Sequence, residues 1–345
     1  MMAGVGARPV VTDGDGGPSE PRTGLTIGVD IGGTKVAAGV VDPHGKILAT
    51  TRRDTPAHDP RQTEGAIADA IRELAAHHAA VAVGLGAAGF VDATRSTVLF
   101  APNLAWRDEP LCAAVEDHVR LPVVVENDAN AAAWAEARFG AGQGEDYVVV
   151  LTVGTGIGGG IVVDGKLLRG RFGLAAEVGH INVVPDGRRC GCGLQGCWEQ
   201  YASGRALVQE AYEQASASPL LARGLLRLGG GRPEAITGPM ITEAAQAGDV
   251  AALQCFDEIG RWLGRGMAQL AAVLDPGVFV IGGGVSTAGE ILRERADLSY
   301  RKHLTARGHR PIADIRIAEL GPEAGIVGAA DLARFVLKGK SRWVK

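Results

Sequence analysis

Short runs of apolar residues alternate along this chain with longer segments in which apolar residues recur at helical spacing. The short runs are rich in Val, Ile and Leu and have the length of buried strands. They cover residues 25–29, 36–42, 81–85, 122–125, 147–153, 161–164 and 278–281. Apolar periods of about 3.6 residues predict helices. They occur at residues 60–80, 111–119, 129–139, 204–227, 242–274 and 323–337. This alternation predicts an α/β protein.

The second half of the chain opens with a repeat of the first half. A shift of 122 residues aligns Asp30 with Thr152 and Gly32 with Gly154. In both copies a strand leads through a glycine turn into a second strand, so each copy is a hairpin whose backbone N–H groups can face an anion. Two such hairpins, each at the start of a domain, suggest that one polyphosphate binds between them.

The repeat suggests two domains, which suits a chain of 345 residues. We expect an N-terminal α/β domain at residues 25–140 and a C-terminal α/β domain at 141–322, with a metal-binding loop at 180–197. A closing helix at 323–337 should pack back on the first domain. Residues 1–24 are rich in Gly, Pro, Asp and Arg and contain no apolar segment, so they predict a disordered tail and not a signal peptide.

Composition limits the partners that this chain can have. A hydrophobic content of 46% and a charged content of 21% are those of an ordinary soluble globular protein. The net charge of −4 gives no basic field, so nucleic acid is not an expected partner. No apolar run approaches the ~20 residues that span a bilayer, so no membrane partner is expected. Five cysteines, three of them in one loop, fit a reducing cytoplasm.

That loop carries the strongest chemical signal in the chain. His180, Cys190, Cys192 and Cys197 lie within 18 residues of one another. Three thiols and one imidazole make a Cys₃His set, which suits a closed, tetrahedral Zn²⁺ site. A disulfide would leave one cysteine over, and unrelated buried thiols would not need this spacing. Zinc is therefore favoured over both alternatives.

Two glutamates flank these ligands. Glu177 comes three residues before His180, and Glu199 comes two after Cys197. Because four protein ligands fill the coordination sphere of the metal, it has no open position for chemistry. It would instead act as a rigid crosslink that fixes the positions of both carboxylates. His180 could then offer its second ring nitrogen to a ligand. The alternative is that both glutamates are solvated loop residues.

The glycine turns resemble known nucleotide-binding motifs without matching them. Residues 28–35 have the spacing of a Walker A loop, but Thr and Lys stand in reverse order and a strand follows instead of a helix. Residues 154–159 read G-x-G-x-x-G, but a Rossmann turn must open a helix and this one opens a strand. A third cluster, 282–284, could let a flat group such as a purine approach the backbone, or it could be a plain strand-to-helix turn.

Two aspartates stand where strands end. Asp128 lies between the predicted strand 122–125 and the alanine-rich helix 129–139, at the carboxyl end of a strand, where α/β proteins place ligands. Asn127 or Asp128 could equally cap the helix, and the two roles can coexist. Asp30, at the end of the first strand, suits a water-mediated Mg²⁺ contact or is a plain turn aspartate.

Five motifs together resemble one family. DIGGTK (30–35), END (126–128), LTVGTGIGGG (151–160), EVGH (177–180) and CGCGLQGCWEQYASG (190–204) are similar to the ROK family of sugar kinases and repressors, and within it to bacterial ATP-dependent glucokinases. The resemblance covers residues 25–337. It implies an actin-like, ribonuclease-H-like ATPase fold of two α/β domains with a cleft between them. It also implies ATP-dependent phosphorylation of glucose at its 6-hydroxyl.

The resemblance assigns roles residue by residue. Asp128 matches the base that contacts the sugar and takes the proton of its 6-hydroxyl. The residues that match the sugar-hydroxyl binders are Gly89, Asn103, Asn127, Glu177, His180 and Glu199. Those that match the ATP contacts are Gly32, Gly33, Thr34, Lys35, Thr152, Gly154, Thr155, Gly156, Gly282, Gly283 and Gly284, with Asp30 as the Mg²⁺ relay. His180, Cys190, Cys192 and Cys197 match the ligands of a structural Zn²⁺.

The sequence argues against two other classes of protein and leaves several kinases open. A ROK repressor needs a winged helix-turn-helix module, and residues 1–24 are too short and too rich in Gly and Pro to form one. The Rossmann mismatch argues against an oxidoreductase. Kinases for N-acetylmannosamine, N-acetylglucosamine or fructose stay open, as does polyphosphate in place of ATP. Family precedent predicts a homodimer or homotetramer, and the cysteine content predicts a cytoplasmic location.

Overall fold

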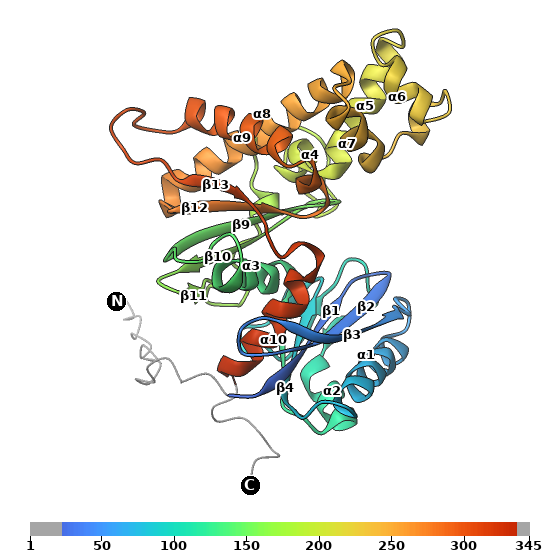
Figure 1. Cartoon of the computed structure of the whole chain (residues 1–345), viewed down its shortest axis with the longest axis vertical. Helices are drawn as coiled ribbons and strands as arrows, with labels where there is room; N and C mark the ends of the chain where they lie inside the picture. Colours follow the sequence, from blue (N-terminus) through green and yellow to red (C-terminus); the bar gives the residue numbers. More distant parts are fainter. Residues whose placement is uncertain (1–22, 337–345) are drawn as a thin grey trace, which may run out of the picture.

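The computed structural model describes residues 23–336. Except for its last two residues, the predicted tail at 1–24 lies outside this range, and so does residue 337 of the predicted closing helix. Two five-stranded sheets with helices on their faces organise the described chain, which confirms the α/β prediction (Figure 1).

The first sheet has the strand order β3-β2-β1-β4-β8. Strands β1, β4 and β8 run parallel, and β2 and β3 add an antiparallel edge. The bounds are Leu25–Ile31 (β1), Lys35–Val41 (β2), Ile47–Asp54 (β3), Ala80–Ala87 (β4) and Val123–Asn127 (β8). Helices α1 (Pro60–Ala75) and α2 (Leu111–Val119) bury their apolar residues against this sheet. A small antiparallel sheet lies beside it, made of β5 (Phe90–Val91), β6 (Val98–Phe100) and β7 (Arg107–Glu109).

The second sheet repeats this topology in the order β11-β10-β9-β12-β13. Its strands are β9 (Tyr147–Val153), β10 (Ile157–Val163), β11 (Lys166–Leu167), β12 (Val278–Gly282) and β13 (Asp314–Ile317). Under the shift of 122 residues, β1 and β2 fall on β9 and β10 with identical bounds. The register differs by one residue, because Ile31 pairs with Val36 whereas Val153 pairs with Ile157. The second glycine turn is therefore one residue shorter than the first.

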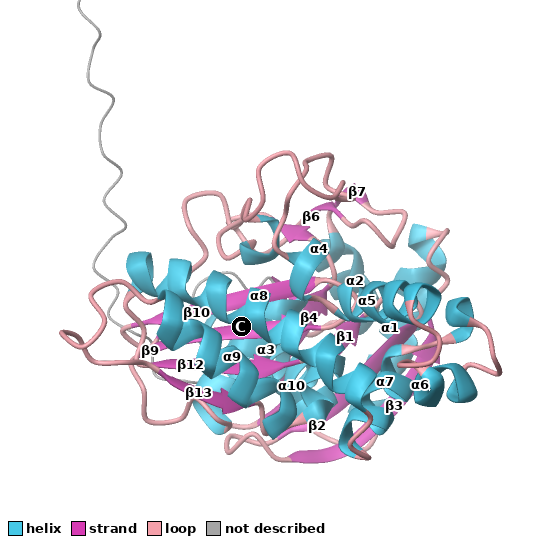
Figure 2. Cartoon of the chain, turned by 90° about the horizontal axis from the view of Figure 1, so that it is seen from above, coloured by secondary structure: helices cyan, strands magenta, loops and turns pink. Residues whose placement is uncertain are grey.

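Helices cover the outer face of the second sheet. Figure 2 looks onto this face, with α8 and α9 in front of the strands. The helices are α4 (Glu199–Ala202), α5 (Gly204–Ala217), α6 (Arg223–Leu228), α7 (Gly238–Gln246), α8 (Val250–Leu274) and α9 (Glu290–His303). Short 3₁₀ helices occur at Val178–His180, Pro233–Ala235, Gly284–Ala288 and Gly321–Glu323. No helix within residues 23–336 combines the length and apolarity that a membrane span needs.

Two helices, α3 (Asp128–Phe139) and α10 (Ala324–Val336), lie between the sheets (Figure 1). One face of this pair packs on the second sheet through Trp134 and Leu332, and the other packs on the first sheet through Ala135 and Ile326. The backbone of α10 approaches β1 and β4 so closely that a Cβ at Gly28 or Gly84 would overlap it. The predicted closing segment thus lies directly on the first sheet.

Some boundaries differ from the sequence predictions. The helix predicted at 204–227 is interrupted between α5 and α6, and the one predicted at 242–274 between α7 and α8. The second break occurs because Gly248 has a φ of +82° and the Asp249 side chain accepts the N–H of Ala252 (3.0 Å), which starts a new helix. Helix α7 begins after its N-cap Thr237, whose side chain makes no capping bond.

Candidate active site

The junction between β8 and α3 carries Asn127 and Asp128. Asn127 is the N-cap of α3, and its Oδ1 accepts the N–H of Asn130 (3.0 Å). Its Nδ2 donates to the carbonyl of Gly89 (3.1 Å), which brings two of the predicted sugar-binding residues together. Asp128 is the first residue of the helix, and its Oδ1 accepts the N–H of Ala129 (2.9 Å). Asn127 therefore caps the helix, which leaves most of the Asp128 carboxylate free.

The Asp128 carboxyl has a perturbed acidity. Burial, together with the negative charges of Asp30 and Glu177, raises the pKa of Asp128 to about 7. Burial also raises the pKa of Asp30, and the positive charge of Lys35 partly offsets this. Asp30 lies in β1, and Asp128 begins α3 between the two sheets. Glu177 lies in the segment that follows β11. Three carboxyls from distant segments thus share one electrostatic environment, as in sites that hold a cation or move a proton.

The first glycine turn lies next to Asn103. A Cβ on Gly33 would lie 3.0 Å from the Asn103 Cβ, so turn and loop are in close contact. The turn is closed by a bond from the Gly32 N–H to the Lys35 carbonyl (3.0 Å). Lys35 lines a surface hollow of about 460 Å³ together with Arg52, Arg53 and Asp54. Positive charge therefore gathers beside this turn.

The second glycine turn contacts Glu199 and the third glycine cluster. The Glu199 carboxylate lies so close to Gly156 that a Cβ there would overlap it. Thr152 pairs with Gly282 across β9 and β12, and Gly283 follows against the backbone of Val153. Thr34, Thr155 and Gly284 are exposed. Both turns and the 282–284 cluster thus end on faces that are open to a ligand.

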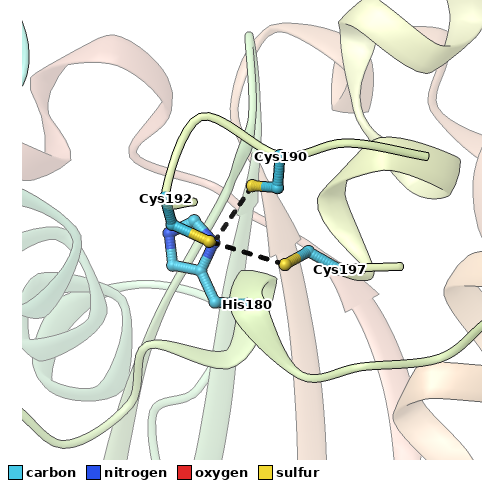
Figure 3. A group of neighbouring side chains, drawn as sticks. All are labelled: His180, Cys190, Cys192 and Cys197. Carbon is cyan, nitrogen blue, oxygen red and sulfur yellow. Dashed lines mark hydrogen bonds between the residues drawn. The ribbon is translucent and has the colours of Figure 1, made fainter. Parts of the chain in front are cut away.

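His180, Cys190, Cys192 and Cys197 form a compact cluster (Figure 3). Their ligand atoms all lie within 4.8 Å of one another. The Cys192 and Cys197 sulfurs are 3.6 Å apart, as are the Cys190 sulfur and His180 Nδ1. Tetrahedral Zn²⁺ with three thiolates and one imidazole spaces its ligand atoms by about 3.5–3.8 Å, so these side chains fit that ion. Nδ1 faces the cluster, which leaves Nε2 of His180 for another partner.

The cluster is tied to both flanking glutamates and to the protein core. The Cys190 sulfur lies 3.0 Å from Oε1 of Glu199. Desolvation and the charge of Glu199 raise the pKa of Glu177, whereas His180 lowers it, so these three groups are neighbours. Trp198 follows the last cysteine, is fully buried, and donates through Nε1 to the carbonyl of Trp262 in α8 (2.9 Å).

Sequence patterns did not reveal one buried ionic network beside Asp128. Glu126 is 2% exposed, and its Oε2 lies 3.1 Å from Nε of Arg95 and 2.8 Å from Nε of Arg169. Its Oε1 accepts the N–H of Asn127 (3.0 Å) and Nδ2 of Asn130 (3.1 Å). A charged residue within a buried strand was the available signal, since such a residue requires partners.

This chain matches known proteins along most of its length. A model of the ROK family matches residues 26–335. A glucokinase of Streptomyces coelicolor is 55% identical over 311 residues, which is 90% of this chain and 98% of that protein. A ROK family glucokinase from Streptomyces griseus, solved in complex with glucose and AMPPNP, has a TM-score of 0.83 and 57% identity, covering 90% of this chain and 99% of that one. A ROK hexokinase from Thermus thermophilus has a TM-score of 0.74 and 38% identity, covering 90% and 97%. This chain belongs to the ROK family.

Proposed function

We propose that this protein transfers the γ-phosphoryl group of ATP to the 6-hydroxyl of glucose. The observation that carries the proposal is the Asp128 carboxyl, whose pKa is raised to about 7 at the head of α3. A general base works best when its pKa lies near the working pH. The likeness to the Streptomyces griseus protein, which was solved with glucose and AMPPNP, supports both the sugar and the donor.

Asp128 is the general base in this proposal. As the 6-oxygen of glucose attacks the γ-phosphorus, the carboxylate takes the hydroxyl proton and the oxygen–phosphorus bond to ADP breaks. Phosphoryl transfer needs positioning and charge neutralisation more than covalent help, so one base is sufficient. Such a base contributes roughly 10²–10⁴-fold to the rate.

The sugar is held by hydrogen-bonding groups around this carboxylate. Glucose exposes hydroxyls on all sides, so its site needs several fixed donors and acceptors. Asn127 is fixed by its bonds to Gly89 and Asn130, and the Glu177, His180 and Glu199 side chains neighbour one another. With Gly89 and Asn103 these residues would surround the sugar, while Nε2 of His180 remains free to bind it.

ATP would lie across the two glycine turns. Residues 32–35 and 152–156 would hold the phosphates through backbone N–H groups, with Lys35 adding positive charge, and 282–284 would contact the adenosine. Asp30 would hold Mg²⁺ through water. The raised pKa of Asp30 indicates a carboxylate that gains from a cation beside it.

The Cys₃His cluster would hold one structural Zn²⁺. When bound, the metal supplies a rigid crosslink and no reaction step, because four protein ligands fill its coordination sphere. Its effect on the sugar would pass through His180, which is a ligand, and through Glu199, next to the Cys190 sulfur.

A coupled ADP-release assay over a panel of hexoses tests the assignment. Glucose should give a higher kcat/KM than N-acetylglucosamine, N-acetylmannosamine or fructose, and ATP should be a better donor than polyphosphate. A better substrate among the other sugars would overturn glucose and leave the kinase reaction standing. A homodimeric or homotetrameric state and a cytoplasmic location stay predictions.

A further inference from the structure

Arg169 connects the two sheets through one side chain. It follows β11 at the edge of the second sheet, and its side chain is 10% exposed. Its Nε lies 2.8 Å from Oε2 of Glu126, which belongs to the first sheet. Its two terminal nitrogens donate to the carbonyls of Ala93 and Asp92 (both 3.0 Å), in the turn between β5 and β6. The guanidinium therefore contacts the first half of the chain through one ion pair and two hydrogen bonds.

On the first sheet, the Glu126 carboxylate fixes the backbone just before Asp128. Because Oε1 accepts the N–H of Asn127, the peptide that leads into the α3 N-cap cannot rotate freely. The same oxygen also accepts Nδ2 of Asn130, one turn into the helix. A shift of the Glu126 carboxylate would therefore also move Asn127 and Asn130, which lie on either side of Asp128.

On the second sheet, Arg169 starts the loop that leads to Glu177. The N–H of Ala175 donates to the Arg169 carbonyl (3.1 Å), which closes residues 169–175 into a compact loop. Gly173, with φ +88°, packs against the backbone of Val91 and Asp92. The loop therefore packs on the same β5–β6 turn that the guanidinium contacts. Glu177 comes two residues after Ala175, where the loop closes.

We infer that Arg169 is a positioning residue that holds the Asp128 carboxylate and the Glu177 carboxylate in register across the two sheets. The inference rests on the proposed function, because it assumes that both carboxylates serve one substrate. The planar fork of a guanidinium suits this task, since it can donate to two carbonyls in fixed directions while its charge pairs with a carboxylate. A lysine could neutralise Glu126 but could not also keep both hydrogen bonds to the carbonyls of Asp92 and Ala93.

Arg95 provides the matched control. Its Nε forms an ion pair with the same Glu126 Oε2 at 3.1 Å, and its side chain is 17% exposed. It comes from the β5–β6 turn itself, so its removal takes one positive charge from Glu126 without cutting a link between the sheets. Comparing substitutions at Arg95 and Arg169 therefore separates charge neutralisation from positioning.

The test measures kcat and KM for glucose and for ATP, together with melting temperature, in wild type, Arg169→Gln, Arg169→Lys and Arg95→Gln. In Arg169→Gln and Arg169→Lys, kcat/KM for glucose should fall on the order of ten- to a hundredfold, as expected for a catalytic group displaced by a fraction of an ångström to one ångström. The KM for ATP should stay within about threefold, because the ATP contacts are made elsewhere. Arg169→Lys should melt closer to wild type than Arg169→Gln and yet remain impaired, whereas Arg95→Gln should keep most of its glucose kcat/KM.

Three results would overturn the inference: wild-type glucose kcat/KM in Arg169→Lys, an equal loss in Arg95→Gln and Arg169→Lys, or a KM for ATP that rises as much as that for glucose. Arg169→Lys keeps the test decisive if Arg169→Gln fails to fold. A wild-type protein that phosphorylates no hexose would instead refute the proposed function, and this inference with it.

Discussion

At the scale of single residues, the proposed chemistry depends on Asp128. Its replacement by Asn keeps the shape of the side chain and leaves the Asn127 cap in place, but an amide cannot take a proton. We expect kcat to fall by at least about 10²-fold while glucose affinity stays within a few-fold. Steady-state kinetics and calorimetric titration with glucose measure the two quantities. Asp249→Asn, at the N-cap of α8, is a control that should leave both unchanged. Turnover within tenfold of wild type would mean that Asp128 is not the base.

The raised pKa of Asp128 predicts the pH dependence of the reaction. A base must be deprotonated to act, so kcat/KM for glucose should rise with pH and reach half its plateau near pH 7, the value to which burial and neighbouring carboxylates raise this pKa. Asp30 is the second cause of the shift, so Asp30→Asn should move the midpoint to lower pH whatever it does to the plateau. A full pH–rate profile of each protein supplies the midpoints. A midpoint in Asp30→Asn that is unchanged or higher would contradict this electrostatic account.

Sequence patterns indicate the residues whose chemistry is local and miss those that depend on distant contacts. Asp128 stands at a strand-to-helix junction, which a short apolar run and an alanine-rich segment mark. Glu126 gives no hint of its partners, because Arg95 comes from a turn and Arg169 from a loop on the other sheet. No periodicity in the sequence relates those two arginines to each other.

At the scale of elements, the metal-binding loop is the part whose rigidity the proposed sugar site needs. Removing zinc with a chelator, or Cys192→Ala, should raise KM for glucose and lower the melting temperature, because the metal's binding energy is partly folding energy. Metal analysis should find one Zn²⁺ per chain, and KM for ATP should change little. Cys255→Ala is the matched control: Cys255 is buried in α8 outside the cluster, so it should cost stability without affecting zinc content or glucose KM. Protein purified without chelator that contains no zinc would contradict the prediction, as would unchanged glucose affinity after verified metal removal.

Elements with a continuous apolar run were predictable, and those with mixed patterns were not. Strand β3 carries the sequence ILATTRRD, in which only Thr51 is buried, because it lies at the edge of its sheet. Strand β13 is also an edge strand and is short. Helix α3 ends at its C-cap Gly140, whose φ of −121° is not left-handed. Glycine is needed there because the Glu136 carboxylate occupies the space of a Cβ.

At the scale of the whole molecule, one buried carboxylate ties together two places where the chain passes between the sheets. Glu136, in α3, accepts the N–H groups of Ala141 (3.0 Å), Glu319 (3.2 Å) and Leu320 (2.8 Å). Ala141 lies where the chain leaves α3 for the second sheet, and Glu319 and Leu320 lie where it returns from β13 to α10. Because both passages are held at one point, this is where a rotation of one sheet against the other would be centred.

Glucose should drive such a rotation if the proposed sugar residues are correct. Asn127 and Asp128 lie at the head of α3, and Glu177, His180 and Glu199 belong to the segment after β11. A single small ligand that binds both groups would hold the two sheets in the closed arrangement, and closure would also exclude water from the γ-phosphate. Hydrogen exchange should therefore slow near residues 127–130 and 177–200 when glucose binds, and ATP alone should protect these amides much less. Glu177→Gln should weaken glucose binding and this protection together. Equal protection by ATP alone, or none at saturating glucose, would show that the sugar does not close the molecule.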